Sequence, residues 1–140
     1  MPSINPEKEA LKALDEITDD GPVIMLNMLR FRDHARYPKG SDYPPCSGRE
    51  AYRRYGVEAI RHVHAVGGKN LWWGAVQLAL VGPEDEEWDE VLLVQYPSRA
   101  AFLRMASDPD YLACSVHRTA ALSDSRLIAM REIVIGRPSR

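Results

Sequence analysis

The run from Trp88 to Pro97 limits the possible folds of this chain more than any other segment. Side chains alternate along a strand, so Val91 and Leu93 point to one face while Leu92 and Val94 point to the other. Both faces of the expected strand are therefore apolar. A strand that is buried on both sides belongs to a sheet with helices on one face and a different cover on the other. In a chain of 140 residues, a second subunit is the expected cover.

Hydrophobic periodicity and turn residues predict the other elements. In order, they are a helix from Pro6 to about Ile17 capped by Asn5, a strand from Val23 to Leu29, a long loop from Arg30 to Gly48, a helix from Glu50 to Val66, a strand from Lys69 to Val81, the strand from Glu90 to Tyr96, a helix from Ser98 to Ala106, a second helical segment to about Leu122, and a strand from Arg126 to Ile135. After the first helix this order is typical of an α+β, ferredoxin-like fold, with a four-stranded antiparallel sheet and helices on one face.

Length and composition fit one domain. With 140 residues and 45% hydrophobic content, the chain can bury an adequate core. We expect a single domain over residues 1–140, in which residues 1–20 form an N-terminal helical extension and residues 21–135 form the ferredoxin-like protomer.

Charge and composition exclude several functional classes. A formal net charge of −2, with acidic and basic residues well mixed, gives no basic surface for nucleic acid. The longest apolar windows are too short to cross a bilayer, and the N-terminus lacks the pattern of a signal peptide, so we expect a cytoplasmic protein with no membrane partner. Cys46 and Cys114 have no CxxC-type neighbour, which favours two reduced thiols.

Five stretches of the chain resemble one known family, the proteins grouped as domain of unknown function 1330 within the dimeric α+β barrel superfamily. The matching stretches are Gly21–Leu29, Tyr52–Gly56, Trp88–Val91, Tyr96–Ser98 and His117–Leu122. The resemblance implies a ferredoxin-like protomer whose sheet pairs face to face with that of a second protomer in a homodimer. The superfamily includes cofactor-free monooxygenases, muconolactone isomerases, dye-decolourising peroxidases and haem-degrading enzymes, so the fold alone does not indicate a reaction.

Single amide side chains interrupt the apolar strands, and a buried amide needs hydrogen-bonding partners or a wet cavity. Asn27, Gln77 and Gln95 could line a pocket. Arg30 and Arg32 follow Asn27 where the strand enters the long loop. An amide followed by guanidinium groups suits a carboxylate or enolate ligand. Alternatively, the amides lie near sheet edges or pair with one another.

A polar cluster at the last helix-to-strand junction is the candidate catalytic group. His117 could transfer protons, with Arg118 or Arg126 stabilising an oxyanion and Asp124 completing the cluster. In the alternative, His117 caps or packs near the helix end, Arg118 and Asp124 form a structural ion pair, and Ser123 or Asp124 shapes the turn.

Aromatic residues could stack against a ligand, although at these positions they are also typical core residues. Tyr52, Trp72 and Trp73 are the candidates, and one of the adjacent tryptophans must face the helices while the other faces away.

His62 and His64 diverge by about 200° on a helix, so one ion cannot bind both, and we expect no metal site.

Two functional hypotheses follow from these residues. The first is a homodimeric enzyme with a small-molecule pocket between sheet and helices, isomerase-like or monooxygenase-like, that uses side chains in place of a cofactor. The second is a module without turnover that holds a metabolite or serves as a stress-associated scaffold.

Overall fold

The central sheet has four antiparallel strands in the order β2-β3-β1-β4. The computed structural model describes residues 2–136. The strands are β1 (Val23–Phe31), β2 (Lys69–Ala75), β3 (Glu90–Tyr96) and β4 (Leu122–Met130). The predicted α+β, ferredoxin-like fold class is therefore confirmed for the protomer.

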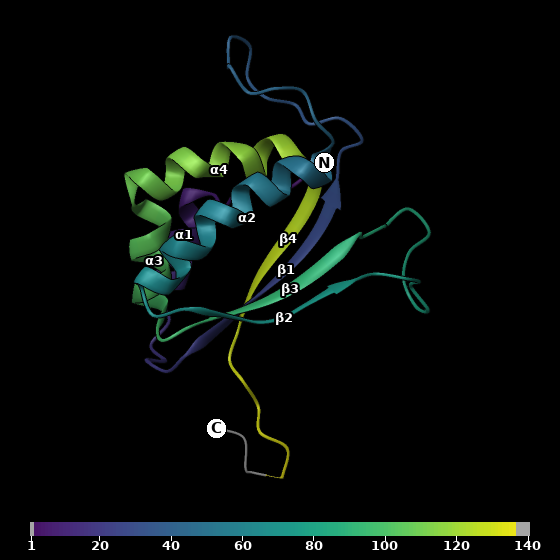
Figure 1. The fold of residues 1–140 in the computed structure, drawn as a ribbon. Coiled ribbons are helices and arrows are strands. Elements are labelled where there is room, and N and C mark those ends of the chain that lie inside the picture. Colours follow the sequence, from purple (N-terminus) through teal and green to yellow (C-terminus); the bar gives the residue numbers. More distant parts are fainter. Residues whose placement is uncertain (1, 137–140) are drawn as a thin grey trace.

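All helices lie on one face of the sheet (Figure 1). They are α1 (Lys8–Glu16), α2 (Gly48–Ala65), α3 (Arg99–Ser107) and α4 (Pro109–Ala121). Helices α2 and α4 pack side by side over the strands, and α1 packs against α3. The Arg99 side chain of α3 fastens the end of α1 by donating from Nε to the carbonyl oxygen of Leu14 at 3.0 Å. No described helix is long and apolar enough to cross a membrane.

Cross-strand register sorts the apolar side chains into two opposite layers, because directly paired residues share a face of the sheet. The inner row, which faces the helices, is Trp73, Leu92, Asn27 and Leu127. The outer row, one position along, is Trp72, Leu93, Leu26 and Ile128. The two tryptophans thus face opposite sides, as expected from strand alternation, and the outer row has no helix above it.

The core between sheet and helices divides into two clusters. One is built around Met25, Tyr96 and Phe102 where the sheet meets α3. The other is built around Leu29 and Leu122, which are fully buried where β1 and β4 meet the start of α2 and the end of α4. The two clusters leave the middle of the inner sheet face for the cavity described below.

Two strand predictions are wrong at their ends. β2 stops at Ala75, not Val81, because Ala75 pairs with the first residue of β3 and the following residues have no partner strand. β4 starts at Leu122, not Arg126, and ends at Met130. Helix α4 passes directly into this strand, so the predicted turn around Asp124 is absent.

Helix boundaries agree better with expectation. Ser98 caps α3, and Asp108 caps α4 and separates the two helices. The predicted cap of α1 is wrong: Glu7 occupies that position without a side-chain hydrogen bond, and the Asn5 amide donates instead to Thr119 Oγ1 at 3.3 Å.

The start of α2 crosses the end of β1 at a distance that only glycine permits. Ser47 and Glu50 form a capping box, and the backbone N–H of Gly48 donates to the carbonyl oxygen of Arg32 at 3.0 Å. A side chain at residue 48 would collide with that oxygen and would lie 2.6 Å from the carbonyl oxygen of Ala121. This crossing holds α2 over the sheet.

We therefore expect Gly48→Ala to lower the free energy of unfolding by about 2 kcal/mol or more, since backbone atoms must move to admit the methyl group. Gly56→Ala is the matched control, because a Cβ there meets nothing within 4 Å. It should stabilise the helix by up to about 1 kcal/mol through helix propensity. Urea unfolding of both variants measures the difference, and equal effects would contradict the close crossing.

Candidate ligand-binding cavity

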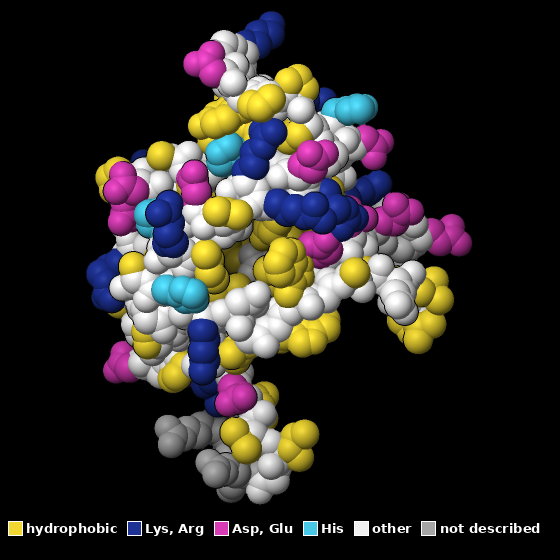
Figure 2. Space-filling model, viewed as in Figure 1, with side chains coloured by type: hydrophobic (Ala, Val, Ile, Leu, Met, Phe, Trp, Pro, Cys, Tyr) yellow, Lys and Arg dark blue, Asp and Glu magenta, His cyan; other side chains and the backbone are white. Residues whose placement is uncertain are grey.

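A cavity of about 850 Å³ lies between the helices and the inner face of the sheet. Its floor is the inner row, and its walls come from α2, α3 and α4. Figure 2 shows a hollow lined with hydrophobic side chains near the centre of the face on which α2 lies. The exposed side chains of Val57 on α2 and Trp73 on β2 mark the mouth.

Glu90 positions Trp73 at this mouth. Its carboxylate accepts a hydrogen bond from the indole Nε1 of Trp73 at 2.9 Å and pairs with Arg49 at the start of α2. The indole is therefore tied to both the sheet and the helix layer. Binding of a ligand would change the surroundings of a fixed aromatic ring.

Tyrosines dominate the polar part of the lining. The hydroxyls of Tyr55 on α2 and Tyr111 on α4 lie 2.7 Å apart, and Tyr52 and Tyr96 also border the cavity. Burial raises the pKa of Tyr52, Tyr55, Tyr96 and Tyr111 above the ordinary value of 10.0. These phenols stay protonated at neutral pH, so they act as hydrogen-bond donors and acceptors but not as bases.

Arg118 is the buried charge in the cavity lining. Only 6% of its surface is exposed. Nη1 donates to the carbonyl oxygen of Ile4 at 2.5 Å and lies 3.5 Å from Asn5 Oδ1, whereas Nη2 is buried and has no hydrogen-bond partner. None of the ion pairs between described residues involves Arg118.

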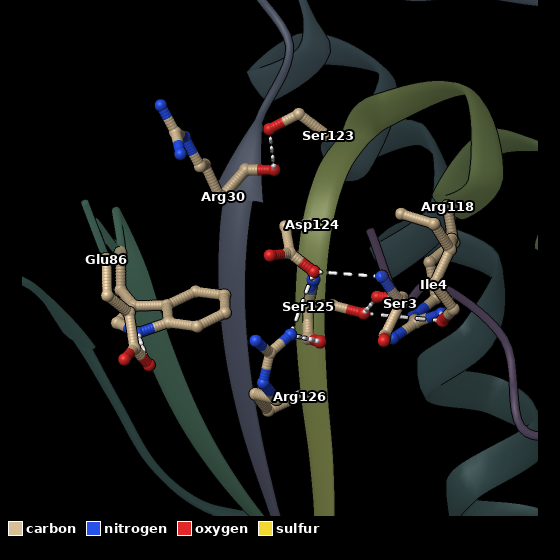
Figure 3. A network of polar contacts seen from close by, with 10 residues as sticks. Ser3, Ile4, Arg30, Glu86, Arg118, Ser123, Asp124, Ser125 and Arg126 are labelled. Carbon is tan, nitrogen blue, oxygen red and sulfur yellow. Dashed lines mark hydrogen bonds and ion pairs between the residues drawn. The ribbon is translucent and has the colours of Figure 1, made fainter. Parts of the chain in front are cut away.

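The N-terminal segment closes the cavity beside Arg118, where Asn5 and Pro6 join the lining. Two hydrogen bonds attach this segment to β4 (Figure 3). Ser125 Oγ donates to the carbonyl oxygen of Ser3 at 2.6 Å, and Ser3 N–H donates to Asp124 Oδ1 at 2.9 Å. The side chains of Arg118, Asp124 and Ser125 thus all bond to the N-terminal segment, and Arg118 does not pair with Asp124.

His117 lies outside the cavity. Consecutive residues on a helix point about 100° apart, and His117 faces the long loop while Arg118 faces the sheet. Its Nδ1 lies 2.7 Å from the hydroxyl of Tyr37, and the Tyr43 ring packs edge-on against the imidazole at 4.6 Å. The geometry therefore does not place His117 and Arg118 in one catalytic group.

Four other predicted site residues lie outside the cavity. Arg30, Arg32, Asp124 and Arg126 border a polar surface hollow of about 1100 Å³ beyond the end of β1. Arg126 pairs with Asp124 at 2.8 Å, so the predicted Arg118–Asp124 pair is replaced by this one. Burial would raise the pKa of Asp124, but the N–H groups of Ser3 and Ser125 and the guanidinium of Arg126 hold it below 3.8.

Gln95 and Trp72 also point away from the cavity. Gln95 borders a small hollow at the far end of the sheet, and Trp72 belongs to the outer row. Of the predicted site residues, the structure brings together Asn27, Tyr52, Trp73 and Arg118. Among the described residues, no group of three or more His, Cys, Asp or Glu side chains is placed to hold a metal ion.

Sequence reasoning missed many lining residues, among them the polar residues Asn5, Asn70 and Tyr111. Helical spacing contained a signal for the last of these. Tyr111, Ser115 and Arg118 are separated by four and three residues and therefore share one face of α4. No local pattern indicated Asn5, because its place depends on where the N-terminal segment crosses β4.

Comparison with known proteins places the chain in a family. The model of the family described as domain of unknown function (DUF1330) matches residues 46–133. The crystal structure of methylated RPA0582 protein is 40% identical, with a TM-score of 0.90, and the alignment covers 97% of this chain and 98% of that one. A second crystal structure, of the RPA0582 protein of unknown function from Rhodopseudomonas palustris, is also 40% identical, with a TM-score of 0.88 and coverage of 96% and 99%.

A more distant structural neighbour shares the fold alone. Hydroxynitrile lyase from Passiflora edulis is 13% identical, with a TM-score of 0.53, and the alignment covers 86% of this chain and 100% of that one. No curated protein matches the sequence. The four-stranded antiparallel sheet with helices on one face defines a ferredoxin-like α+β protein. The chain belongs to the DUF1330 family.

The buried position of His117 predicts a pH-dependent loss of stability. Burial lowers the pKa of its imidazole below 6.5, and Arg54 lowers it further while Glu58 opposes them. As the pH falls below about 6.5, the unfolded chain binds a proton that the folded chain does not, so unfolding is favoured. His117→Gln should therefore flatten the decline of the unfolding free energy with falling pH, as measured by urea titrations.

His34→Gln serves as the control, because His34 is exposed in the long loop. It should keep the wild-type dependence on pH. A wild-type slope in His117→Gln would show that the imidazole is not held neutral by burial.

Proposed function

We propose that this protein binds a small, largely apolar molecule in the cavity between its helices and sheet. The observation that supports this is the combination of size and lining: about 850 Å³ enclosed mainly by apolar and aromatic side chains, with a few convergent polar groups. Known small-molecule sites have volumes of roughly 300–1,000 Å³ and the same kind of lining. The site of the ligand would thus be the middle of the inner sheet face.

The lining favours binding over proton-transfer catalysis. Among the described residues, no His, Asp, Glu, Lys or Cys lines the cavity, and the tyrosines are protonated at neutral pH. A general base must lie within hydrogen-bond reach of the proton it takes. His117 is turned towards Tyr37, outside the cavity lining, which argues against the role first considered for it.

A cofactor-independent isomerase-like or monooxygenase-like activity is the second candidate. Its support is the unpaired Nη2 of Arg118, because a guanidinium in a low-dielectric cavity can stabilise an enolate oxygen. In that case Arg118 and Asn27 would polarise the substrate. The phenols of Tyr55 and Tyr111 would donate protons.

Filling the cavity tests the proposal. Ala59 on α2 is buried and lines the cavity, so Ala59→Phe should occupy the ligand's space. We expect the neutral dye phenylnaphthylamine to fluoresce on binding to the wild type and to lose at least about tenfold in affinity for this variant. Ala113→Phe, at an exposed position of α4 that does not line the cavity, should bind the dye as the wild type does.

Circular dichroism and thermal unfolding must show that Ala59→Phe is folded, because overpacking can cost about 1–3 kcal/mol. Undiminished dye binding by a folded Ala59→Phe variant would contradict the assignment of the cavity as the binding site.

We further propose that the protein forms a homodimer through the outer face of its sheet. Trp72 and Ile128 of the outer row are 56% and 46% exposed, and no described element covers the row. An apolar row of this kind across all strands is typical of a protein interface. The resemblance of the chain to the dimeric α+β barrel superfamily supports the same arrangement, with a second copy as the cover.

Ile128→Glu should split this dimer. The residue is half-exposed in the protomer, so the charge should leave the fold intact but should be costly inside an apolar interface. Analytical ultracentrifugation should show a dimer for the wild type and a monomer for the variant. Leu80→Glu, at a position 87% exposed in the β2–β3 loop, should remain dimeric. A monomeric wild type would refute the proposal.

A further inference from the structure

We infer, on the basis of the proposed binding function, that the ligand is an aryl carboxylate whose carboxylate group pairs with Nη2 of Arg118. Three properties of the described residues support this assignment: an unsatisfied buried guanidinium, the absence of an acidic side chain to neutralise it, and aromatic walls beside it.

The first property is the half-used guanidinium of Arg118. A buried charge is costly unless it is paired and its donors are all satisfied. Nη1 donates to the Ile4 carbonyl oxygen, whereas Nη2 has no hydrogen-bond partner, and the residue lines the cavity. A carboxylate is the group that best matches such a donor, since charge-assisted bonds from arginine to carboxylate are short and strong.

The second property is the charge balance of the cavity. No Asp or Glu among the described residues lines it, and Arg53 near the mouth adds a second positive charge. The Arg118 charge also acts on the phenols of Tyr52, Tyr55 and Tyr111, although burial keeps these protonated. The enclosed space is therefore positive, so it selects an anion over a neutral or cationic molecule of the same shape.

The third property is the aromatic lining, which suits a planar apolar body. Tyr52, Tyr55, Tyr111 and Trp73 line the same cavity as Arg118. The paired hydroxyls of Tyr55 and Tyr111 share one hydrogen bond at 2.7 Å but carry two protons, so one proton remains to donate to a ligand oxygen. Ring edges and faces of the tyrosines would contact an aryl group in offset or edge-on geometry.

Isothermal titration with the matched pair trans-cinnamate and trans-cinnamamide tests the inference. The two molecules have the same shape and differ in the charge of one group. At neutral pH, wild-type protein should bind the carboxylate at least about tenfold more tightly than the amide, because only the carboxylate pairs with the buried charge. Arg118→Met should bring the affinity ratio to about one, and Arg118→Lys should retain part of the preference.

Arg61→Met is the matched control, because Arg61 is exposed on α2 and does not line the cavity. It should keep the wild-type ratio. A folded Arg118→Met variant that still prefers cinnamate would overturn the role of Arg118. If that variant does not fold, the wild-type ratio alone decides whether the cavity selects a carboxylate.

The outcomes separate the inference from the proposed function. Equal binding of cinnamate and cinnamamide by the wild type, abolished in both cases by Ala59→Phe, would refute the carboxylate and leave the binding cavity standing. Binding of neither molecule would count against the inference, and failure of phenylnaphthylamine to bind as well would remove the proposed function.

Discussion

The pairing of β1 with both β3 and β4 is the constraint on which the rest of the structure depends. β1 lies between these strands, so its alternation decides which residues of both neighbours face the helices. Asn27 and Leu26 are adjacent in sequence, yet one borders the cavity and the other belongs to the outer row. A slip of one residue in this register would exchange the two layers, turning the cavity floor outward.

The cavity exists because the helix layer and the chain terminus meet around a charged residue. α4 presents Arg118 to the inner face, and the Ile4 carbonyl of the N-terminal segment satisfies one of its terminal nitrogens. The hydrogen bond between Ser3 and Ser125 of β4 brings that carbonyl group into place (Figure 3). Nη1 of Arg118 therefore has a structural role, which is to hold Ile4 and Asn5, whereas Nη2 has no partner among the described residues.

Patterns along the chain predicted what depends on local physics. The strand Glu90–Tyr96, the cap at Ser98 and the helix expected from Glu50 to Val66, observed as Gly48–Ala65, follow from strand alternation, capping chemistry and helical period. The same patterns overextended β2, because its apolar residues beyond Ala75 lie in the β2–β3 loop without a partner strand. They also predicted a turn at Asp124, since that polar segment of β4 gives no sign that β1 will pair with it.

The sequence by itself determined the α+β fold class, the opposed directions of Trp72 and Trp73, and Asn27, Tyr52, Trp73 and Arg118 as candidate ligand residues. Each of these depends on residue type and on periods of two or 3.6 residues, which are local properties. Only the tertiary structure decided that Arg118 and His117 lie in different environments. It also decided that Asn5 joins the cavity lining, through contacts with Thr119 and Arg118 of α4, which lie more than a hundred residues further along the chain. Those outcomes depend on helix rotation and on long-range chain crossings, because side chains far apart in sequence meet only once the elements have packed.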